Sequence, residues 1–496
     1  ESVTFESGSK LKKPNNNAFT RDTALKNVTL PESLTEIGTY VFQMTAIESI
    51  TVPAGVTSIG SNAFAGCSEL KVVNFPSGAK LSSLGSGAFQ NCTALTALQL
   101  PDSVTSIGTT AFQNTGFVEF TVPDGVATIG VNTFQKSLAL KKVTLPDSVT
   151  SIGNYAFDGC TALTEVRMSA ALETIGTYAF RDCVSLQKAV LPATTEKIGN
   201  YAFSGCVSLT SFTVPTSLTA IPNYAFYGCT GLTSMTIPAN VTSIGQYAFA
   251  GCTSLANLEL LVGVEKIDSC AFSGCTALKS VDIPGSVTTI VGNPFMGSTA
   301  LTTITVASDN VDYVVKDRIL YTSNLATIVA CPSDLAGEFI VEETVTAIAD
   351  GAFAYTDITR VTIHEGITKL PNYVFDGCDK LVEANYSSFV TTIGDYAFRG
   401  TALRSVYVDK RVTKIGDGAF ENCALLTELT FNQTGSDRLT IGIDAFRTDP
   451  IKELVLPLRI YTTGVTGRAL HGVDKYCFAD NPELRTVRFG NEGNVS

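Results

Sequence analysis

The feature that most constrains the fold is a phenylalanine that returns every 23 residues. From Phe134 to Phe295 this step holds for seven intervals. In residues 154–283, six copies read Ala-Phe with a cysteine three residues after the phenylalanine. A fixed period of about 20 to 50 residues is typical of solenoids. We therefore expect one stack of similar coils rather than several globular domains.

One copy shows how such a coil would fold. In Leu95-Thr-Ala-Leu98-Gln-Leu100-Pro101 the second half alternates apolar and polar residues, which predicts a short strand that ends at the proline. Val104-Thr-Ser-Ile107-Gly108 predicts a second extended segment and a turn, after which Phe112 fills the interior. A single unit cannot bury both its leucines and its phenylalanine, whereas stacked copies can.

Ten of the thirteen cysteines follow the same period. Ten lie three residues after a phenylalanine: Cys67, Cys92, Cys160, Cys183, Cys206, Cys229, Cys252, Cys275, Cys378 and Cys423. Stacked coils would bring these cysteines close together, but with their Cα–Cβ bonds parallel, which disfavours disulfides. Free cysteine is also a small buried hydrophobe. We interpret them as buried structural thiols.

Composition excludes several classes of partner. The net charge is −12 and the pI is about 4.8, which argues against binding to nucleic acid or to anionic membranes. The longest uncharged stretch, residues 198–258, alternates apolar residues with Ser, Thr and Asn, so we expect no membrane insertion. No signal peptide or anchor is recognisable, and we expect any such segment to have been removed from this chain.

The repeat resembles that of BspA-like leucine-rich repeat surface proteins, roughly LxxLxLPxxVxxIGxxAFxxCxx. Nineteen phenylalanines mark copies from about Ala18 to Phe489. The resemblance implies a β-rich leucine-rich-repeat solenoid with a right-handed superhelix. It places a parallel β-sheet on the concave face and short turns or 3₁₀ segments on the convex side. It also implies secretion or display at the cell surface, and adhesin-like binding of host matrix proteins or other cells.

Two irregularities interrupt the period. Phenylalanines before Phe134 are spaced by 22 to 25 residues, and the interval from Phe295 to Phe353 is 58 residues. Two β-rich runs within that interval, 311–321 and 325–332, predict a hairpin-like variant coil. It would either keep the stack continuous or project as a contact element. We divide the solenoid into an arm at 1–305, a variant island at 306–340 and an arm at 341–496.

No residues suggest catalysis. The two histidines, His364 and His471, lack the local partners of a nucleophilic triad, and we interpret both as surface imidazoles. No motif for a metal, phosphate or nucleotide is present. We expect a protein that is not an enzyme and binds no cofactor or metal.

Recognition would then rest on outward-facing side chains. Tyr155, Tyr178, Tyr201, Tyr224 and Tyr247 lie two residues before a phenylalanine. Ser211, Thr213, Ser234 and Thr236 lie beside the inward residues of two predicted strands. Tyrosine offers flat apolar area with a polar hydroxyl, which suits sugars or proteins. Alternatively, the rings only pack against one another for stability. We select Tyr201, Tyr224, Tyr247 and the four hydroxyl residues as candidate ligand contacts.

The leading functional prediction is a non-catalytic, adhesin-like binding protein that recognises an extracellular protein or glycan. The alternative is a structural spacer that displays another domain.

Overall fold

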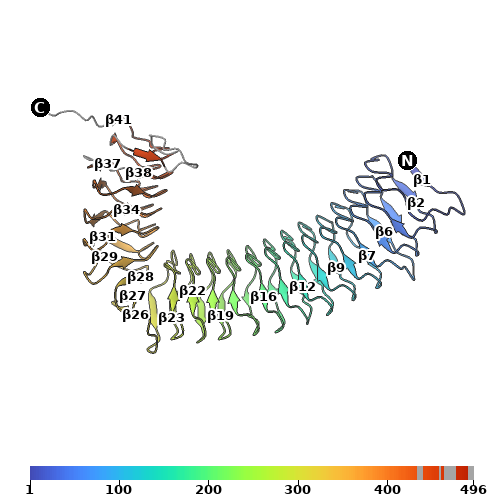
Figure 1. Cartoon of the computed structure of the whole chain (residues 1–496), viewed down its shortest axis with the longest axis horizontal. Helices are drawn as coiled ribbons and strands as arrows, with labels where there is room; N and C mark the ends of the chain where they lie inside the picture. The colour runs from blue at the N-terminus through green and yellow to red at the C-terminus, as the bar shows by residue number, and fades with distance from the viewer. Residues whose placement is uncertain (433–438, 457–459, 463–475, 490–496) are drawn as a thin grey trace. The chain divides into compact units, whose positions relative to one another are not determined.

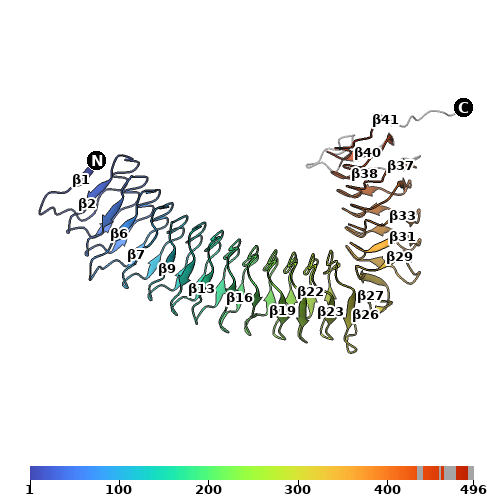
Figure 2. The same cartoon turned by 180° about the vertical axis from the view of Figure 1, so that it is seen from behind.

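The computed structural model describes residues 1–432, 439–456, 460–462 and 476–489. The chain forms two compact units, Glu1–Gly263 and Val264–Ser496. Each is a stack of short parallel β-coils, without a helix in the described ranges (Figures 1 and 2). The predicted β-solenoid is confirmed. Segments between the strands are turns; none of the described residues is in a 3₁₀ helix.

In most coils the leucine-rich segment forms the first strand, and neighbouring copies pair in parallel. The segment 95–100, from which this strand was predicted, buries Leu98 and Leu100 but is not a strand, so the prediction is wrong for that coil. Val143 on β11 lies in register with Phe120 on β9 and Val166 on β13. These three side chains are buried, whereas residues on either side of them face outward. In the first unit these strands are β1 (Ser2–Thr4), β2 (Asn27–Thr29), β4 (Ser49–Thr51), β6 (Val72–Asn74), β9 (Glu119–Thr121), β11 (Lys142–Thr144), β13 (Glu165–Arg167), β15 (Lys188–Ala189), β17 (Ser211–Phe212), β19 (Ser234–Ile237) and β21 (Asn257–Leu260). In the second unit they are β23 (Ser280–Ile283), β25 (Thr303–Val306), β29 (Ala336–Ile340), β31 (Asp357–Ile363), β33 (Glu383–Tyr386), β35 (Ser405–Val408), β37 (Glu428–Phe431), β39 (Glu453–Leu456) and β41 (Thr486–Phe489).

Just before the turn that leads to the phenylalanine, a second strand of two or three residues carries an isoleucine in most coils. Most coils therefore contribute to two ladders. Ile152, for example, is in register with Ile129 and Ile175. In the first unit these strands are β3 (Glu36–Ile37), β5 (Ser58–Ile59), β7 (Ser83–Leu84), β8 (Ser106–Ile107), β10 (Thr128–Ile129), β12 (Ser151–Ile152), β14 (Thr174–Ile175), β16 (Lys197–Ile198), β18 (Ala220–Ile221) and β20 (Ser243–Ile244). In the second unit they are β22 (Lys266–Ile267), β24 (Thr289–Ile290), β30 (Ala347–Ile348), β32 (Lys369–Leu370), β34 (Thr392–Ile393), β36 (Lys414–Ile415), β38 (Leu439–Ile441) and β40 (Ile460–Thr462).

The turn around each phenylalanine supplies a third line of hydrogen bonds. Tyr155 and Gly159 flank Phe157 with φ angles of 57° and 70°, a left-handed conformation that recurs at the same two positions in most coils. This geometry directs the Phe157 N–H to the Ala179 carbonyl of the next coil, at 2.8 Å. A tyrosine in this conformation pays a steric cost that glycine would avoid. The surrounding hydrogen bonds and ring packing must offset that cost.

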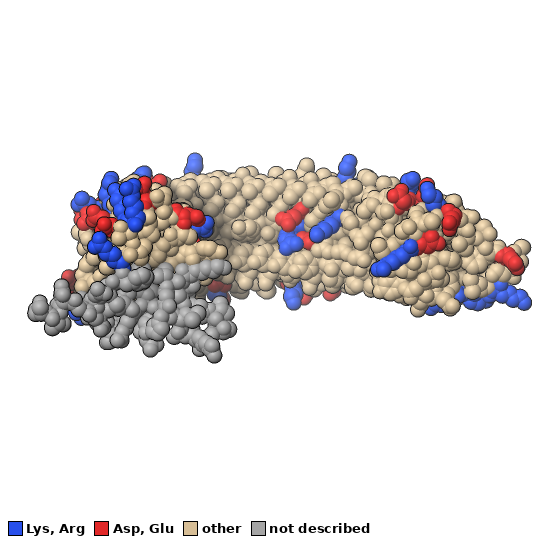
Figure 3. All heavy atoms as spheres, turned by 90° about the horizontal axis from the view of Figure 1, so that it is seen from above, with Lys and Arg blue, Asp and Glu red and all other residues tan. Residues whose placement is uncertain are grey.

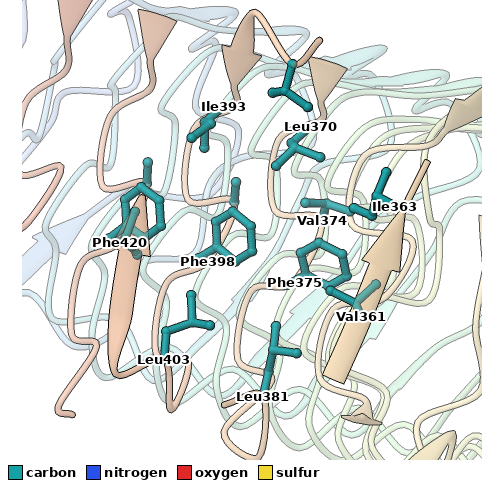
Figure 4. Close-up of a cluster of buried hydrophobic side chains, with 14 of the residues drawn as sticks. Val361, Ile363, Leu370, Val374, Phe375, Leu381, Ile393, Phe398, Leu403 and Phe420 are labelled. Atoms are coloured by element: carbon teal, nitrogen blue, oxygen red, sulfur yellow. The ribbon is translucent and has the colours of Figure 1, made fainter. Parts of the chain in front are cut away.

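Stacked phenylalanine rings form the core. The rings of Phe157 and Phe180 lie 5.1 Å apart at an interplanar angle of 5°, and both are fully buried. Burying one such ring stabilises the fold by about 1.5–3 kcal/mol. Figure 4 shows the same arrangement in the second unit, where Phe375, Phe398 and Phe420 lie between buried leucines and isoleucines.

All thirteen cysteines are buried free thiols, as predicted for the ten at the repeat position. The thiol of Cys183 donates to the carbonyl oxygen of Phe157 in the preceding coil, at 3.2 Å. Cys206 and Cys229 repeat this contact with Phe180 and Phe203. The Phe157 carbonyl also accepts from the Cys160 N–H of its own coil at 3.1 Å, so the thiol is its second donor.

Four coils carry threonine at the cysteine position and are one residue shorter. The four segments are Thr45-Ala-Ile47, Thr115-Gly-Phe117, Thr356-Asp-Ile358 and Thr401-Ala-Leu403. In each, the threonine hydroxyl donates to the phenylalanine carbonyl of its own coil, at 2.8–3.0 Å. In a short coil the threonine hydroxyl thus donates to a carbonyl of its own coil, whereas the cysteine thiol at the same position, as in Cys183, donates to the preceding coil.

The long interval after Phe295 contains an antiparallel meander in the second unit, formed by β26 (Tyr313–Lys316), β27 (Ile319–Thr322) and β28 (Thr327–Ala330). β28 then pairs in parallel with β30. The phenylalanine turns bypass the meander, because the Asn293 N–H donates directly to the Asp350 carbonyl. The hairpin-like segment therefore lies within the stack, while the division into arms at 305 and 340 stays a prediction.

Candidate functional site

The five predicted tyrosines form one continuous stack in the first unit. Successive ring centroids from Tyr155 to Tyr247 are 4.8, 4.6, 4.3 and 4.9 Å apart, with interplanar angles of 7–18°. All five side chains are half-buried. The left-handed turn brings every ring to the same place on its coil, so the 23-residue repeat produces the stack directly.

Stacking decides which part of each ring a ligand could reach. Each inner ring has a neighbour on both faces at less than 5 Å, which is within the range of direct aromatic packing. The inner rings therefore present only their edges. Tyr201 and Tyr224 cannot offer a flat face to a ligand while the stack is intact.

An arginine lies at one end of this stack. The guanidinium of Arg181 is 4.8 Å from the Tyr178 ring centroid and 5.8 Å from that of Tyr155. Its Nε donates to the carboxylate of Asp158, which is 2% exposed. This bond is the first cause of the raised pKa of Arg181. The second unit repeats the arrangement with Arg399, Asp376 and Tyr396.

The predicted hydroxyl residues lie on a different segment of each coil. Ser211 on β17 and Ser234 and Thr236 on β19 are exposed, as is Thr213 just after β17. They face outward from the first strand ladder, whereas the tyrosines lie in the turn after the second. The structure thus brings the three tyrosines together and the four hydroxyl residues together, as two separate rows.

Both rows lie in a band of the first unit that has no charged residue, residues 198–258, here called the neutral band. It spans nearly three coils, or about 13 Å along the stack at the usual strand spacing. Outside the band, charged side chains commonly pair, as Lys142 does with Glu165. Figure 3 shows one face of the molecule, with small mixed groups of charges separated by uncharged surface.

Sequence reasoning missed Tyr227 within the neutral band. Its ring is 5.9 Å from that of Tyr224, tilted by 55°, and its side chain is 46% exposed. Unlike the stacked tyrosines, it extends beyond the turn. The available signal was its position directly after Phe226, where the neighbouring coils have Ser204 and Ala250.

The two histidines are predicted to be surface imidazoles, and the structure describes one of them. His364 is held between main-chain groups, with Nε2 3.0 Å from the Val345 carbonyl and Nδ1 accepting from the Gly366 N–H. His471 lies outside the described residues. No group of three or more potential metal ligands occurs in the described part of the chain. Within it, no helix has the length and apolar character needed to cross a membrane.

Comparison with known proteins gives a family match over most of the chain. The model of the BspA-type leucine-rich repeat region (six copies) matches residues 1–117, 105–233, 219–335 and 346–484. A leucine-rich cell surface protein from Faecalibacterium prausnitzii is 26% identical with a TM-score of 0.51, covering 76% of this chain and 88% of that one.

Two further solved structures are similar with lower TM-scores. A leucine-rich repeat protein from Bacteroides ovatus is 22% identical with a TM-score of 0.40, covering 92% and 87% of the two chains. The T. pallidum leucine-rich repeat protein is 33% identical with a TM-score of 0.31, covering 32% of this chain and 78% of that one. No curated protein sequence matches the chain.

Proposed function

Because the chain belongs to the BspA-type leucine-rich repeat family, we propose that it is a non-catalytic, adhesin-like binding protein that is secreted or displayed at a cell surface. The family suggests a protein-binding or cell-surface role. The finer proposal is that the neutral band, residues 198–258, is the contact surface, with an extracellular protein as its partner. A rigid stack of coils loses little conformational entropy on binding.

The neutral band carries this proposal because its composition resembles the centre of a protein interface. Such centres are depleted of charged residues and enriched in tyrosine. The band combines a complete lack of charge with Tyr201, Tyr224, Tyr227 and Tyr247. Val207, at 40% exposed, adds apolar area beside them.

Ring geometry favours a protein over a glycan at this band. A sugar stacks on the free face of an aromatic ring, whereas the inner tyrosines have both faces covered by neighbours. Their exposed edges and the hydroxyls of Ser211, Thr213 and Ser234 suit hydrogen bonds and packing against another protein. The Thr236 hydroxyl donates to Glu259 at 3.1 Å and can still accept.

The test is binding of the whole chain to arrayed extracellular matrix proteins and glycans, followed by kinetics for any protein that binds. We expect Thr213→Lys, which places a charge in the middle of the strand row, to weaken binding at least about tenfold. Tyr227→Ser reports on the turn row and introduces the residue that stands at this position in the preceding coil. Affinity should change little between about 0.05 and 0.5 M NaCl, because the band itself has no charged residue and Glu259, which accepts from Thr236, lies at its border.

Thr121→Lys is the matched control. Phe120-Thr121-Val122-Pro123 repeats the sequence Phe212-Thr213-Val214-Pro215 in a coil outside the band, and both threonines are exposed. If Thr121→Lys and Thr213→Lys weaken binding equally, the neutral band is not the contact surface. If no protein or glycan binds, the spacer alternative replaces the adhesin-like function.

A further inference from the structure

A groove opens in the second unit where the first strand ladder is interrupted. β33 and β35 belong to consecutive coils but to separate sheets, whereas the second strands of the same coils, β34 and β36, remain paired. The groove between them has a volume of about 560 Å³. Ligand sites commonly measure about 300–1,000 Å³.

The coil that follows the opening is one of the four short coils. β35 follows Thr401-Ala-Leu403, which has one residue fewer than the usual segment between turn and strand. Two other short coils, those of Thr45 and Thr115, also border a groove against the coil before them. The groove at β33 and β35 is the largest of the three.

The floor of the groove is apolar and held in place. Phe420 is fully buried beneath it, within the core shown in Figure 4. The phenol of Tyr386 donates across the opening to the Tyr407 carbonyl, at 3.0 Å. Desolvation raises the pKa of Tyr386, so the phenol stays protonated and keeps this bond. The two strand edges are therefore fixed relative to each other without direct pairing.

One aromatic ring at the rim has an available face. Tyr407 points outward from β35 and is 54% exposed. Among the described residues, no aromatic ring stacks against it. This differs from the inner rings of the tyrosine stack in the first unit, which are covered on both faces.

Planar polar groups line the same groove. Asn385 donates to Glu383, whose carboxylate also lies 3.4 Å from Arg360. The guanidinium of Arg404 is exposed and has no ion-pair partner within the described part of the chain. The lining also includes Asp409, Ser387, Ser388 and Ser405.

We propose that this groove binds one or two residues of a neutral saccharide, with a pyranose ring stacked on Tyr407. Hydroxyl groups both donate and accept, and the lining offers both acceptors (Glu383, Asn385, Asp409) and donors (Arg404, serines). The lining contains one guanidinium, Arg404, and two carboxylates, Glu383 and Asp409, and Glu383 also lies 3.4 Å from Arg360. The groove therefore has no excess of positive charge that would favour an anionic ligand. The site is independent of the neutral band, since it lies in the other unit and uses different side chains.

The experiment is saturation-transfer NMR and calorimetry of the whole chain with the methyl pyranosides of glucose, galactose and mannose. We expect saturable binding of at least one, with a Kd below about 10 mM. Methyl glucuronide, which adds a carboxylate, should bind more weakly than methyl glucoside. A blocked hexapeptide of alternating alanine and serine tests whether the strand edges bind main chain instead.

Tyr407→Thr should lower the affinity at least about tenfold. It installs the residue found at the paired position of the next strand, Thr430, so the fold should be retained. Thr430→Ala is the matched control and should leave the affinity within about twofold. Thr213→Lys, in the neutral band, should not affect saccharide binding, which separates this proposal from the proposed function.

Absence of saturable binding by all three glycosides would overturn the proposal. Binding that Tyr407→Thr does not change would also overturn it, and so would binding of the peptide alone.

Discussion

Arg181 donates from Nε to Oδ1 of Asp158 at 2.7 Å and from Nη2 to Oδ2 at 3.2 Å, joining two coils across a 23-residue step. Asp158 is almost fully buried and also accepts from the Gln135 amide at 2.8 Å. Arg181→Ser leaves this carboxylate without its cation. We expect the free energy of unfolding, measured by urea unfolding, to fall by about 3–5 kcal/mol.

The double variant Asp158→Ser with Arg181→Ser provides the control. Ser204 already stands at the equivalent position two coils after Asp158, so serine is compatible with the turn. The double variant should be more stable than Arg181→Ser alone, because it removes the uncompensated charge. Equal or lower stability of the double variant would contradict this account.

The threonine of a short coil makes a separate prediction. Thr401 is buried and donates to the Phe398 carbonyl at 2.9 Å, and its oxygen lies 3.3 Å from the Cys423 sulfur. Thr401→Val keeps the shape of the side chain but removes the hydrogen-bond donor. We therefore expect the free energy of unfolding, measured in urea, to fall by about 1–3 kcal/mol. Thr413→Val, at an exposed threonine on the same coil, should cost less than about 0.5 kcal/mol.

The sequence was sufficient to predict the coil and its core. Spacing of the phenylalanines predicts buried rings such as Phe157 and Phe180, and alternation in the leucine-rich segment predicts buried residues such as Leu98 and Leu100. Both follow from local alternation and one period. The grooves were not predicted, although the 22-residue spacings were visible. Whether two strand edges stay paired is a property of neighbouring coils together: β17 and β19 separate between full-length coils, whereas β2 and β4 stay paired beside a short one.

The candidate site was predicted less completely. The repeat brought Tyr201, Tyr224 and Tyr247 to one line, and stacking between them was one of the two alternatives drawn from the sequence. Which ring faces remain open depends on interplanar angles, which residue spacing does not specify. Tyr407 and Tyr227 were missed because each is an exception to the repeat. In a repetitive chain, the departures from the consensus are where recognition chemistry can differ between coils.

Buried thiols lead to a prediction about reactivity. Cys160, Cys183 and Cys206 are fully buried, and desolvation raises the pKa of each thiol. The thiolate is the reactive form, so the native chain should not react with Ellman's reagent at pH 8. All thirteen cysteines should react after unfolding in urea. Rapid reaction of the native chain, followed by assignment to these positions, would contradict the buried ladder.

Asp449 replaces cysteine at the ladder position and makes the stability of its coil depend on pH. Its side chain is fully buried, Oδ1 accepts from the Cys423 N–H at 2.8 Å, and Oδ2 has no hydrogen-bond partner in the described structure. Burial, and secondarily the charge of Glu421, raises the pKa of Asp449 to about 8. The folded state therefore favours the protonated acid, whereas the unfolded chain ionises near pH 4.

The contribution of Asp449 to the stability of this coil should therefore be most favourable below pH 4. It should fall by on the order of 5 kcal/mol as the pH rises towards 8.

Asp449→Ser should remove this pH dependence. Ser298 shows that serine fits, because its Oγ accepts from the Cys275 N–H at 3.1 Å, as Asp449 does from Cys423. Hydrogen exchange of the Cys423 amide at pH 5, 7 and 9, corrected for intrinsic rates, measures the local opening free energy. The variant should be more protected than the original chain at pH 9 and similar at low pH. An unchanged pH dependence in Asp449→Ser would show that another group controls this coil.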